Sequence, residues 1–112
     1  MQRNPQFKAH IRMTFEERNP AFPRKFGFDA AGHRRLPLQM EGVEGLHTVG
    51  LWTEKKNEVL SEHDEFDAEC IILWEEGFHS VVAPGVRFKL WDGRFIADGV
   101  ITERVETGWN RK

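Results

Sequence analysis

The sequence lacks several features that would assign a function directly. It has one cysteine, Cys70, so no disulfide can form within the chain, and a reducing, cytoplasmic location is expected. It has no tyrosine, no apolar run near its start that resembles a signal peptide, and no run long enough to span a membrane. No apolar stripe at helical spacing extends over the length of a helix. We therefore expect one small domain with little helix.

Motifs for catalysis and metal binding are also missing. There is no Gly-x-x-x-x-Gly-Lys-Ser/Thr phosphate loop, so hydrolysis of GTP is not expected. The five histidines lack the close pairing typical of zinc ligands, so no metal site is predicted. Residues 61–64, Ser-Glu-His-Asp, contain the residue types of a nucleophilic triad, but chain neighbours rarely converge around an oxyanion hole, and a solvated loop is expected. We predict neither enzyme activity nor a cofactor.

Alternating apolar residues predict an all-β fold. Residues 7–15 alternate over their whole length, which places one face of a strand in a core and the other in water. Shorter segments of the same kind lie at 25–29, 66–74 and 86–105, with turn residues between them. This spacing is typical of a β-barrel or a β-sandwich.

The last third of the chain predicts a β-hairpin. Asp92-Gly93 lies between two β-rich runs, which favours a two-residue type I′ turn because both central residues of that turn need positive φ. Gly99 interrupts the second run. Ile96 and Val100 would face the core together only if a bulge near Gly99 shifted the alternation, so we predict a bulge there.

These segments resemble the C-terminal (third) β-barrel domain of elongation factor Tu. The likeness is closest where Gly-Val-Arg-Phe (85–88), Asp-Gly-Arg (92–94) and Ile-Ala-Asp-Gly-Val-Ile (96–101) are similar to that family's Gly-hydrophobic-Arg-Phe strand, Gly-Arg turn and Gly-Val-Val closing strand. Phe-Lys-Ala at 7–9 resembles the family's opening strand, whereas residues 41–62 match nothing in it. Without a phosphate loop, the chain is expected to stand alone, without the family's GTPase domain.

The resemblance implies a fold and a class of function. We predict a closed antiparallel β-barrel of about six strands. It would form a single domain over residues 1–112, with flexible tails at 1–5 and 107–112. In the resembled family this barrel is a docking surface for tRNA and protein partners, so a translation-related, cytoplasmic binding module is expected.

Charge is distributed unevenly along the chain, although the net charge is −2. Residues 1–37 have eight Lys/Arg against three Asp/Glu, residues 38–80 two against eleven, and residues 81–112 six against four. An ordinary dipolar surface is one explanation. The other is an anion-facing N-terminal surface beside an acidic belt that meets a basic partner.

Two functions follow from these patterns. The first is a non-enzymatic module that docks a protein partner. The second is an accessory protein that contacts RNA or tRNA phosphates with its N-terminal basic residues, although RNA-binding proteins usually have a basic total charge. Trp91, on the polar side of the hairpin, would stack on a base or anchor a protein, unless a loop buries it in part. The candidate contact residues are Arg12, Arg24, Lys25, Arg34, Arg35, Arg87, Trp91 and Arg94.

Overall fold

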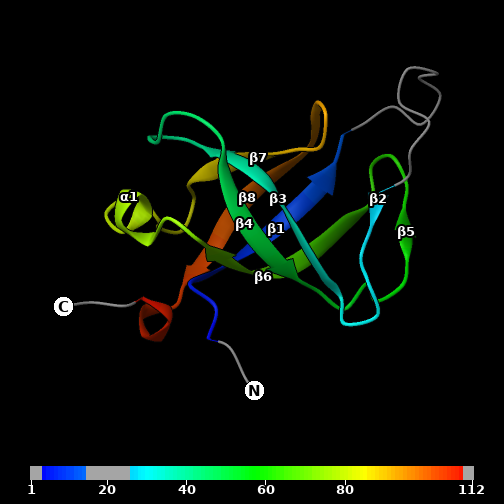
Figure 1. The fold of residues 1–112 in the computed structure, drawn as a ribbon, viewed down its shortest axis with the longest axis horizontal. Helices are drawn as coiled ribbons and strands as arrows, with labels where there is room; N and C mark the ends of the chain where they lie inside the picture. Colours follow the sequence, from blue (N-terminus) through cyan, green and yellow to red (C-terminus); the bar gives the residue numbers. More distant parts are fainter. Residues whose placement is uncertain (1–3, 15–25, 110–112) are drawn as a thin grey trace.

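Six strands close into an antiparallel barrel in the computed structural model, which describes residues 4–14 and 26–109. The barrel confirms the predicted all-β fold and its six strands (Figure 1). In order around the barrel, the strands are β1 (Phe7–Met13), β6 (Glu65–Ile72), β4 (His47–Trp52), β3 (His33–Met40), β7 (Arg87–Trp91) and β8 (Phe95–Arg104).

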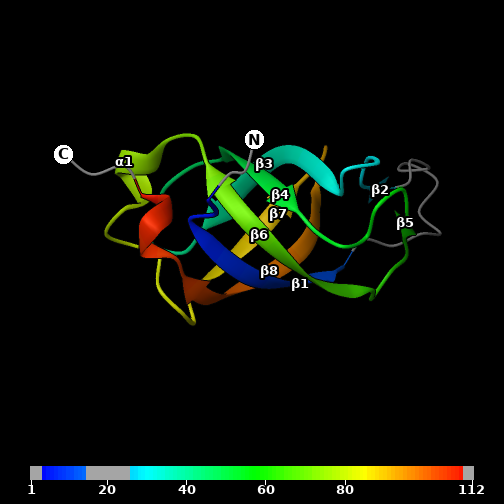
Figure 2. The same cartoon turned by 90° about the horizontal axis from the view of Figure 1, so that it is seen from below.

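Small elements cover the two ends of the barrel. A ribbon of β2 (Phe26–Gly27) and β5 (Val59–Leu60) lies at one end, and the short helix α1 (Glu75–Phe78) and the 3-10 turn η1 (Glu106–Gly108) lie at the other (Figures 1 and 2). Residues 41–62, which match nothing in the resembled family, supply the barrel strand β4 and the strand β5.

Alternation along β1 and β6 fills one side of the barrel interior. Successive side chains of a strand point to opposite faces, so every second residue of these strands is buried. Cys70 is one of them, and burial raises the pKa of its thiol, so it packs as a small apolar group rather than as a reactive thiolate. The buried residues of β1 and β6 are Phe7, Ala9, Ile11, Met13, Phe66, Ala68, Cys70 and Ile72.

The connection between β7 and β8 differs from the predicted type I′ turn. Trp91 pairs with Phe95, so three residues, 92–94, form the loop instead of two. Gly93 has φ of 82°, but Asp92 does not have the positive φ that the first central residue of a type I′ turn requires. The predicted hairpin is present, and its predicted turn type is wrong.

The predicted bulge at Gly99 is also wrong. The register of β8 shifts twice, at Ile96 against β7 and at Thr102 against β1. Gly99 lies between these shifts, faces inward opposite Phe88, and has no positive φ. A Cβ at Gly99 would overlap the Phe88 ring, so glycine is needed here for space rather than for its backbone freedom. Val100 consequently lies on the outer face, half-buried.

The chain is packed as far as Trp109, so the predicted tail from residue 107 onward is wrong up to that residue. Trp109 is 6% exposed, and its Nε1–H donates to the backbone oxygen of Gln6 at 3.2 Å. Arg104 lies 4.4 Å from the Trp109 ring. The last turn therefore closes the end of the barrel beside the first residues of β1.

Candidate docking surface

The outer faces of β6 and β7 carry opposite charges. Glu65, Asp67 and Glu69 point outward from β6, and Arg87 and Lys89 point outward from β7. Two strands separate β6 from β7 in either direction around the closed barrel, so the two sets face opposite sides. The acidic belt of residues 38–80 therefore contributes carboxylates to the β6 side, whereas the cations on the opposite side come from residues 81–112.

Within residues 4–14 and 26–37, the basic residues do not gather on one face. Arg12 lies on β1 and is paired in register with Glu65 of the acidic strand β6. Arg34 and Arg35 lie on β3, which is separated from β1 by two strands in either direction. Two further predicted contact residues lie outside the described residues, and these are Arg24 and Lys25.

Arg34 uses its guanidinium within the molecule. Its Nη2 donates to Asp92 Oδ2 at 3.0 Å, and its Nη1 donates to the backbone oxygen of Gly27 at 3.3 Å. The same group lies 4.5 Å above the Phe26 ring. Arg34 therefore ties β2 to the β7–β8 hairpin, a structural role that sequence spacing did not reveal.

The remaining predicted residues lie on β3, on β7 and in the hairpin loop. Arg35 is exposed on β3, Arg87 begins β7, and Arg94 follows in the loop. Trp91 ends β7 and packs edge-on against Phe95, with ring centroids 5.0 Å apart. The neighbouring strand therefore contributes to its half-burial.

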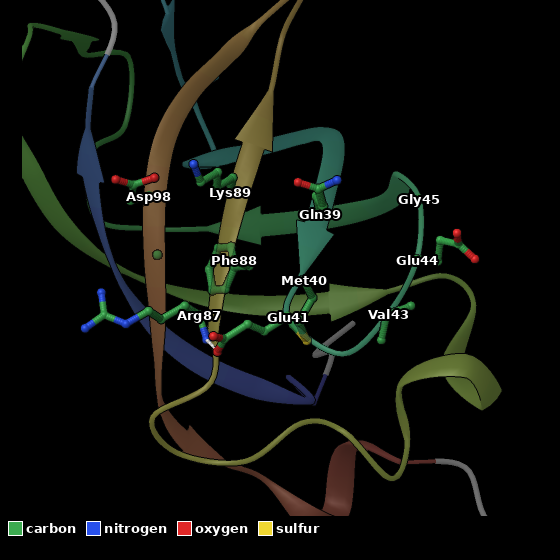
Figure 3. Close-up of a pocket in the computed structure, with 11 residues that line it drawn as sticks. Gln39, Met40, Glu41, Val43, Glu44, Gly45, Arg87, Phe88, Lys89 and Asp98 are labelled. Carbon is green, nitrogen blue, oxygen red and sulfur yellow. Dashed lines mark hydrogen bonds between the residues drawn. The ribbon is translucent and has the colours of Figure 1, made fainter.

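A groove of about 460 Å³ runs over β3, β7 and β8. Gln39, Lys89 and Asp98 form one row across the three strands (Figure 3). The connection 41–45 stands beside this row as a wall, with Val43 on the same side as the groove (Figure 3). We call this feature the β7 groove.

Charges of both signs line the β7 groove. Arg87 and Lys89 supply cations, and Glu41, Glu44 and Asp98 supply carboxylates. The backbone N–H of Arg87 donates to Glu41 Oε1 at 3.0 Å, which holds the base of the wall against β7. A nucleic-acid backbone would meet repulsion from the carboxylates, whereas a protein surface of mixed charge fits them.

Three large apolar side chains are exposed on two neighbouring segments at the α1 end of the barrel. Leu46, Leu73 and Trp74 are 43%, 65% and 49% exposed, and we call them the apolar cluster. The ring of His47 stacks on Trp74 with centroids 4.9 Å apart, and the N–H of Leu73 donates to the backbone oxygen of Thr48 at 3.3 Å. These contacts place the chain at 46–48 directly beside the chain at 73–74.

The apolar cluster adjoins the β7 groove. His47 Nε2 donates to the backbone oxygen of Glu44 at 2.9 Å, and Glu44 is part of the groove wall. We call the cluster and the groove together the docking surface. Sequence reasoning missed the cluster, although the apolar run at 70–74 extends two residues past the end of β6 and could have indicated it.

His10 of β1 lies between two carboxylates of β6, on the opposite side from the β7 groove. Its Nε2 is 2.6 Å from Glu65 Oε1, and its Nδ1 is 2.8 Å from Asp67 Oδ1. Both nitrogens donate only when the ring is protonated. The hydrogen bonds to Glu65 and then to Asp67 therefore raise the pKa of His10 above its ordinary value of 6.5.

Stability should depend on pH through His10. Folding raises the pKa of His10. Its contribution to the free energy of unfolding is therefore complete below the pKa of His10 in the unfolded state, about 6.5, and is lost as the pH rises through the pKa of His10 in the folded state. The variant His10→Asn should therefore be less stable than the wild type in acid and should approach it in alkaline solution. Urea unfolding over a pH series from about 5 to 9 measures this difference. If the difference in unfolding free energy between the two proteins did not change with pH, the role of His10 would be contradicted.

No protein-family model matches the chain, and no curated protein matches it either. Within residues 4–14 and 26–109, no three His, Cys, Asp or Glu side chains are grouped so that they could hold a metal ion. The helices of that part are all too short to cross a bilayer. Function is therefore inferred from the geometry of the docking surface.

Proposed function

We propose that this protein is a non-enzymatic module that docks a protein partner through the docking surface. The apolar cluster is the observation that carries the proposal, because large apolar side chains exposed on neighbouring segments are typical of interaction sites. Trp74 is the expected anchor, since tryptophan is enriched among residues that dominate binding energy. The barrel architecture supports a likeness to the third domain of elongation factor Tu, and with it a cytoplasmic, translation-related role.

The apolar cluster supplies a moderate part of the binding energy. Its three side chains are about half exposed, so covering them contributes on the order of 3 kcal/mol in all. Association costs at least that much in lost translational and rotational freedom. Contacts in the neighbouring β7 groove must therefore add to the affinity, and its mixed charges select for the partner's charge pattern.

Trp74 is held in position before a partner binds. The His47 ring stacks on it, and the buried Phe78 ring meets it edge-on with centroids 6.2 Å apart. Gly77 leaves room for the indole, because a Cβ there would overlap the Trp74 ring. Little rotamer freedom is lost when such a side chain is covered, which favours its role as an anchor.

RNA binding is the alternative, and the charge geometry gives it less support. Cations of β1 are interleaved with the acidic residues of β6, with Lys8 opposite Glu69 and Arg12 opposite Glu65. Arg34 is engaged with Asp92. Phosphates bind where cations gather without nearby carboxylates, so neither strand offers a suitable path for a nucleic-acid backbone.

We expect no saturable binding of tRNA at low salt. A salt titration of tRNA binding compares the wild type with a variant in which Arg24, Lys25, Arg34 and Arg35 are all replaced by alanine. Saturable binding of tRNA by the wild type would favour the RNA function instead. In that case the slope of log K against log salt should flatten in the variant by about one unit per lost phosphate contact.

A capture experiment tests the proposed function. Wild-type protein, the double variant Leu73→Ser/Trp74→Ala and the control Val59→Ser are used as baits in native lysate, with and without RNase. Val59 is 59% exposed and lies on β5 at the other end of the barrel, so it controls for loss of exposed apolar surface (Figure 1). We expect a protein that the wild type and the Val59→Ser bait retain in both arms and the double variant loses.

Two outcomes would contradict the proposed function. Retention of the same proteins by the wild type and the double variant would show that the apolar cluster makes no contact with a partner. Loss of the captured protein after RNase treatment would show that RNA, rather than the barrel surface, makes the link.

A further inference from the structure

Two carboxylates border the apolar cluster. Glu44 lies on the groove wall, and its backbone oxygen accepts the hydrogen bond from His47 that joins the wall to the cluster. The Glu44 carboxylate points away from β7 (Figure 3). Glu76 is exposed in α1, two residues after Trp74. The segments that carry the apolar cluster therefore carry acidic side chains beside it.

These two carboxylates are not used within the barrel in the way that their neighbour is. The carboxylate of Glu75 accepts a hydrogen bond at 3.0 Å from Nε2 of Gln6, which is buried. Glu44 and Glu76, in contrast, make no ion pair within residues 4–14 and 26–109. They are available to cations of a partner, and an apolar centre with a polar rim is the usual anatomy of a protein interface.

The apolar centre of this surface is open to solvent. Leu73 is 65% exposed, and Trp74 is 49% exposed. The part of the indole that meets His47 and Phe78 fixes its orientation, and the exposed half is the surface that a partner can cover. Burial of these two side chains therefore requires no rearrangement of the barrel.

The closed barrel favours a helical partner at this surface. Each of its six strands is paired on both sides, so the barrel has no free strand edge to which an extended segment could add. An extended segment lying across the strands would leave its own backbone groups without partners in the barrel. A helix hydrogen-bonds its own backbone and presents apolar residues on one face.

We propose that the docking surface binds an amphipathic helix of the partner whose apolar face is bordered by lysine or arginine. Apolar residues of the helix cover Leu73 and Trp74, and its flanking cations meet the carboxylates of Glu44 and Glu76. A helix with acidic flanks would bring like charges together and bind less tightly. The helix belongs to the partner of the same surface, so the inference rests on the proposed function.

The probes are three synthetic peptides of about 14 residues, a length at which helices begin to form. One has leucines at helical spacing on one face and lysines elsewhere. The second has glutamates in place of the lysines, and the third has serines in place of the leucines. Calorimetry at low salt should show that the wild type binds the leucine–lysine peptide about tenfold more tightly than either of the others.

Variants of the apolar centre and of its rim should both weaken binding of the leucine–lysine peptide. Trp74→Ala should weaken it about tenfold, because the anchor is removed. Glu44→Gln/Glu76→Gln should weaken it about fivefold, as expected for the loss of two exposed ion pairs. An affinity of this double variant equal to that of the wild type would overturn the proposal.

A matched control separates the rim from general attraction to acidic protein. Glu54→Gln/Glu69→Gln removes two carboxylates from the side of the barrel formed by β1, β6 and β4, away from the docking surface. It should leave the affinity for the leucine–lysine peptide within about twofold of the wild type. Equal weakening by the two double variants would overturn the proposal, and so would a wild type that does not bind this peptide.

Other results distinguish a wrong partner from a wrong surface. If the leucine–glutamate peptide bound more tightly and Trp74→Ala removed that binding, the basic helix would be overturned while the docking surface stood. If Trp74→Ala bound the leucine–lysine peptide as the wild type does, the docking surface itself would be contradicted. A wild type that sediments as a dimer, with Trp74→Ala as a monomer, would show that a second copy of the chain covers the surface instead of a basic helix.

Discussion

Replacing Gly99 with valine is expected to lower the free energy of unfolding by about 3 kcal/mol. Gly99 faces the barrel interior directly opposite Phe88, whose ring is 2% exposed and occupies the space that a side chain would need. A valine at this position must displace the ring or push β7 away from β8. Overpacking of a close-packed interior costs energy in both cases. Urea unfolding of the two proteins measures the loss.

Two companion variants establish that the Phe88 ring is the cause. Asp98→Val adds the same β-branched side chain to the neighbouring exposed position and should change stability by about 0.5 kcal/mol or less. Phe88→Leu replaces the ring with a smaller side chain. The losses of unfolding free energy in Phe88→Leu and Gly99→Val should therefore be less than additive in the double variant. If Gly99→Val and Asp98→Val had the same midpoint of urea unfolding, β8 would accommodate the valine side chain at position 99.

Replacing Trp109 with alanine is expected to destabilise the protein by about 4 kcal/mol. The indole is buried against Arg104, meets the His79 ring edge-on with centroids 5.4 Å apart, and donates to the backbone oxygen of Gln6. The substitution leaves a cavity and also removes the indole's hydrogen bond to the Gln6 carbonyl, which keeps the one from the N–H of Val105. Thermal or urea unfolding measures the change.

Trp74→Ala is the matched control for Trp109→Ala. The same side chain is removed, but from an indole that is 49% exposed, so the loss should be about 1 kcal/mol or less. Similar losses for the two variants would show that the C-terminal turn adds little to the barrel. The small effect at Trp74 also allows binding to be compared in a folded protein.

Local patterns in the sequence predict the strands well but not their contacts. The alternation at 7–15 suffices to predict β1, because the inward and outward positions of a strand alternate whatever lies beside it. Alternation along β8 gives no sign that the Phe88 ring of β7 fills the space beside Gly99. For that reason the predicted bulge is wrong, although glycine is needed at this position. Closure of the barrel followed from the family resemblance rather than from the alternation, which also suits a sandwich.

Candidate site residues were harder to predict, because a surface is formed by residues distant in the sequence. The run of cations in residues 1–37 gives no sign that β1 and β3 lie on opposite sides of the barrel. The acceptor of Arg34, Asp92, is 58 positions away. His47 and Trp74 likewise meet only because β4 and β6 are neighbours in the sheet. Pairing between strands decides all three cases, and composition does not encode it.

The affinity of the captured partner for two variants tests the central proposal most directly. Calorimetry should show that Trp74→Ala weakens binding by about 30-fold, equivalent to about 2 kcal/mol for the loss of an anchor residue. Val59→Ser, which removes exposed apolar surface at the opposite end of the barrel, should stay within about twofold of the wild type. Wild-type affinity in Trp74→Ala, or an equal loss in Val59→Ser, would contradict the assignment of the docking surface to the α1 end.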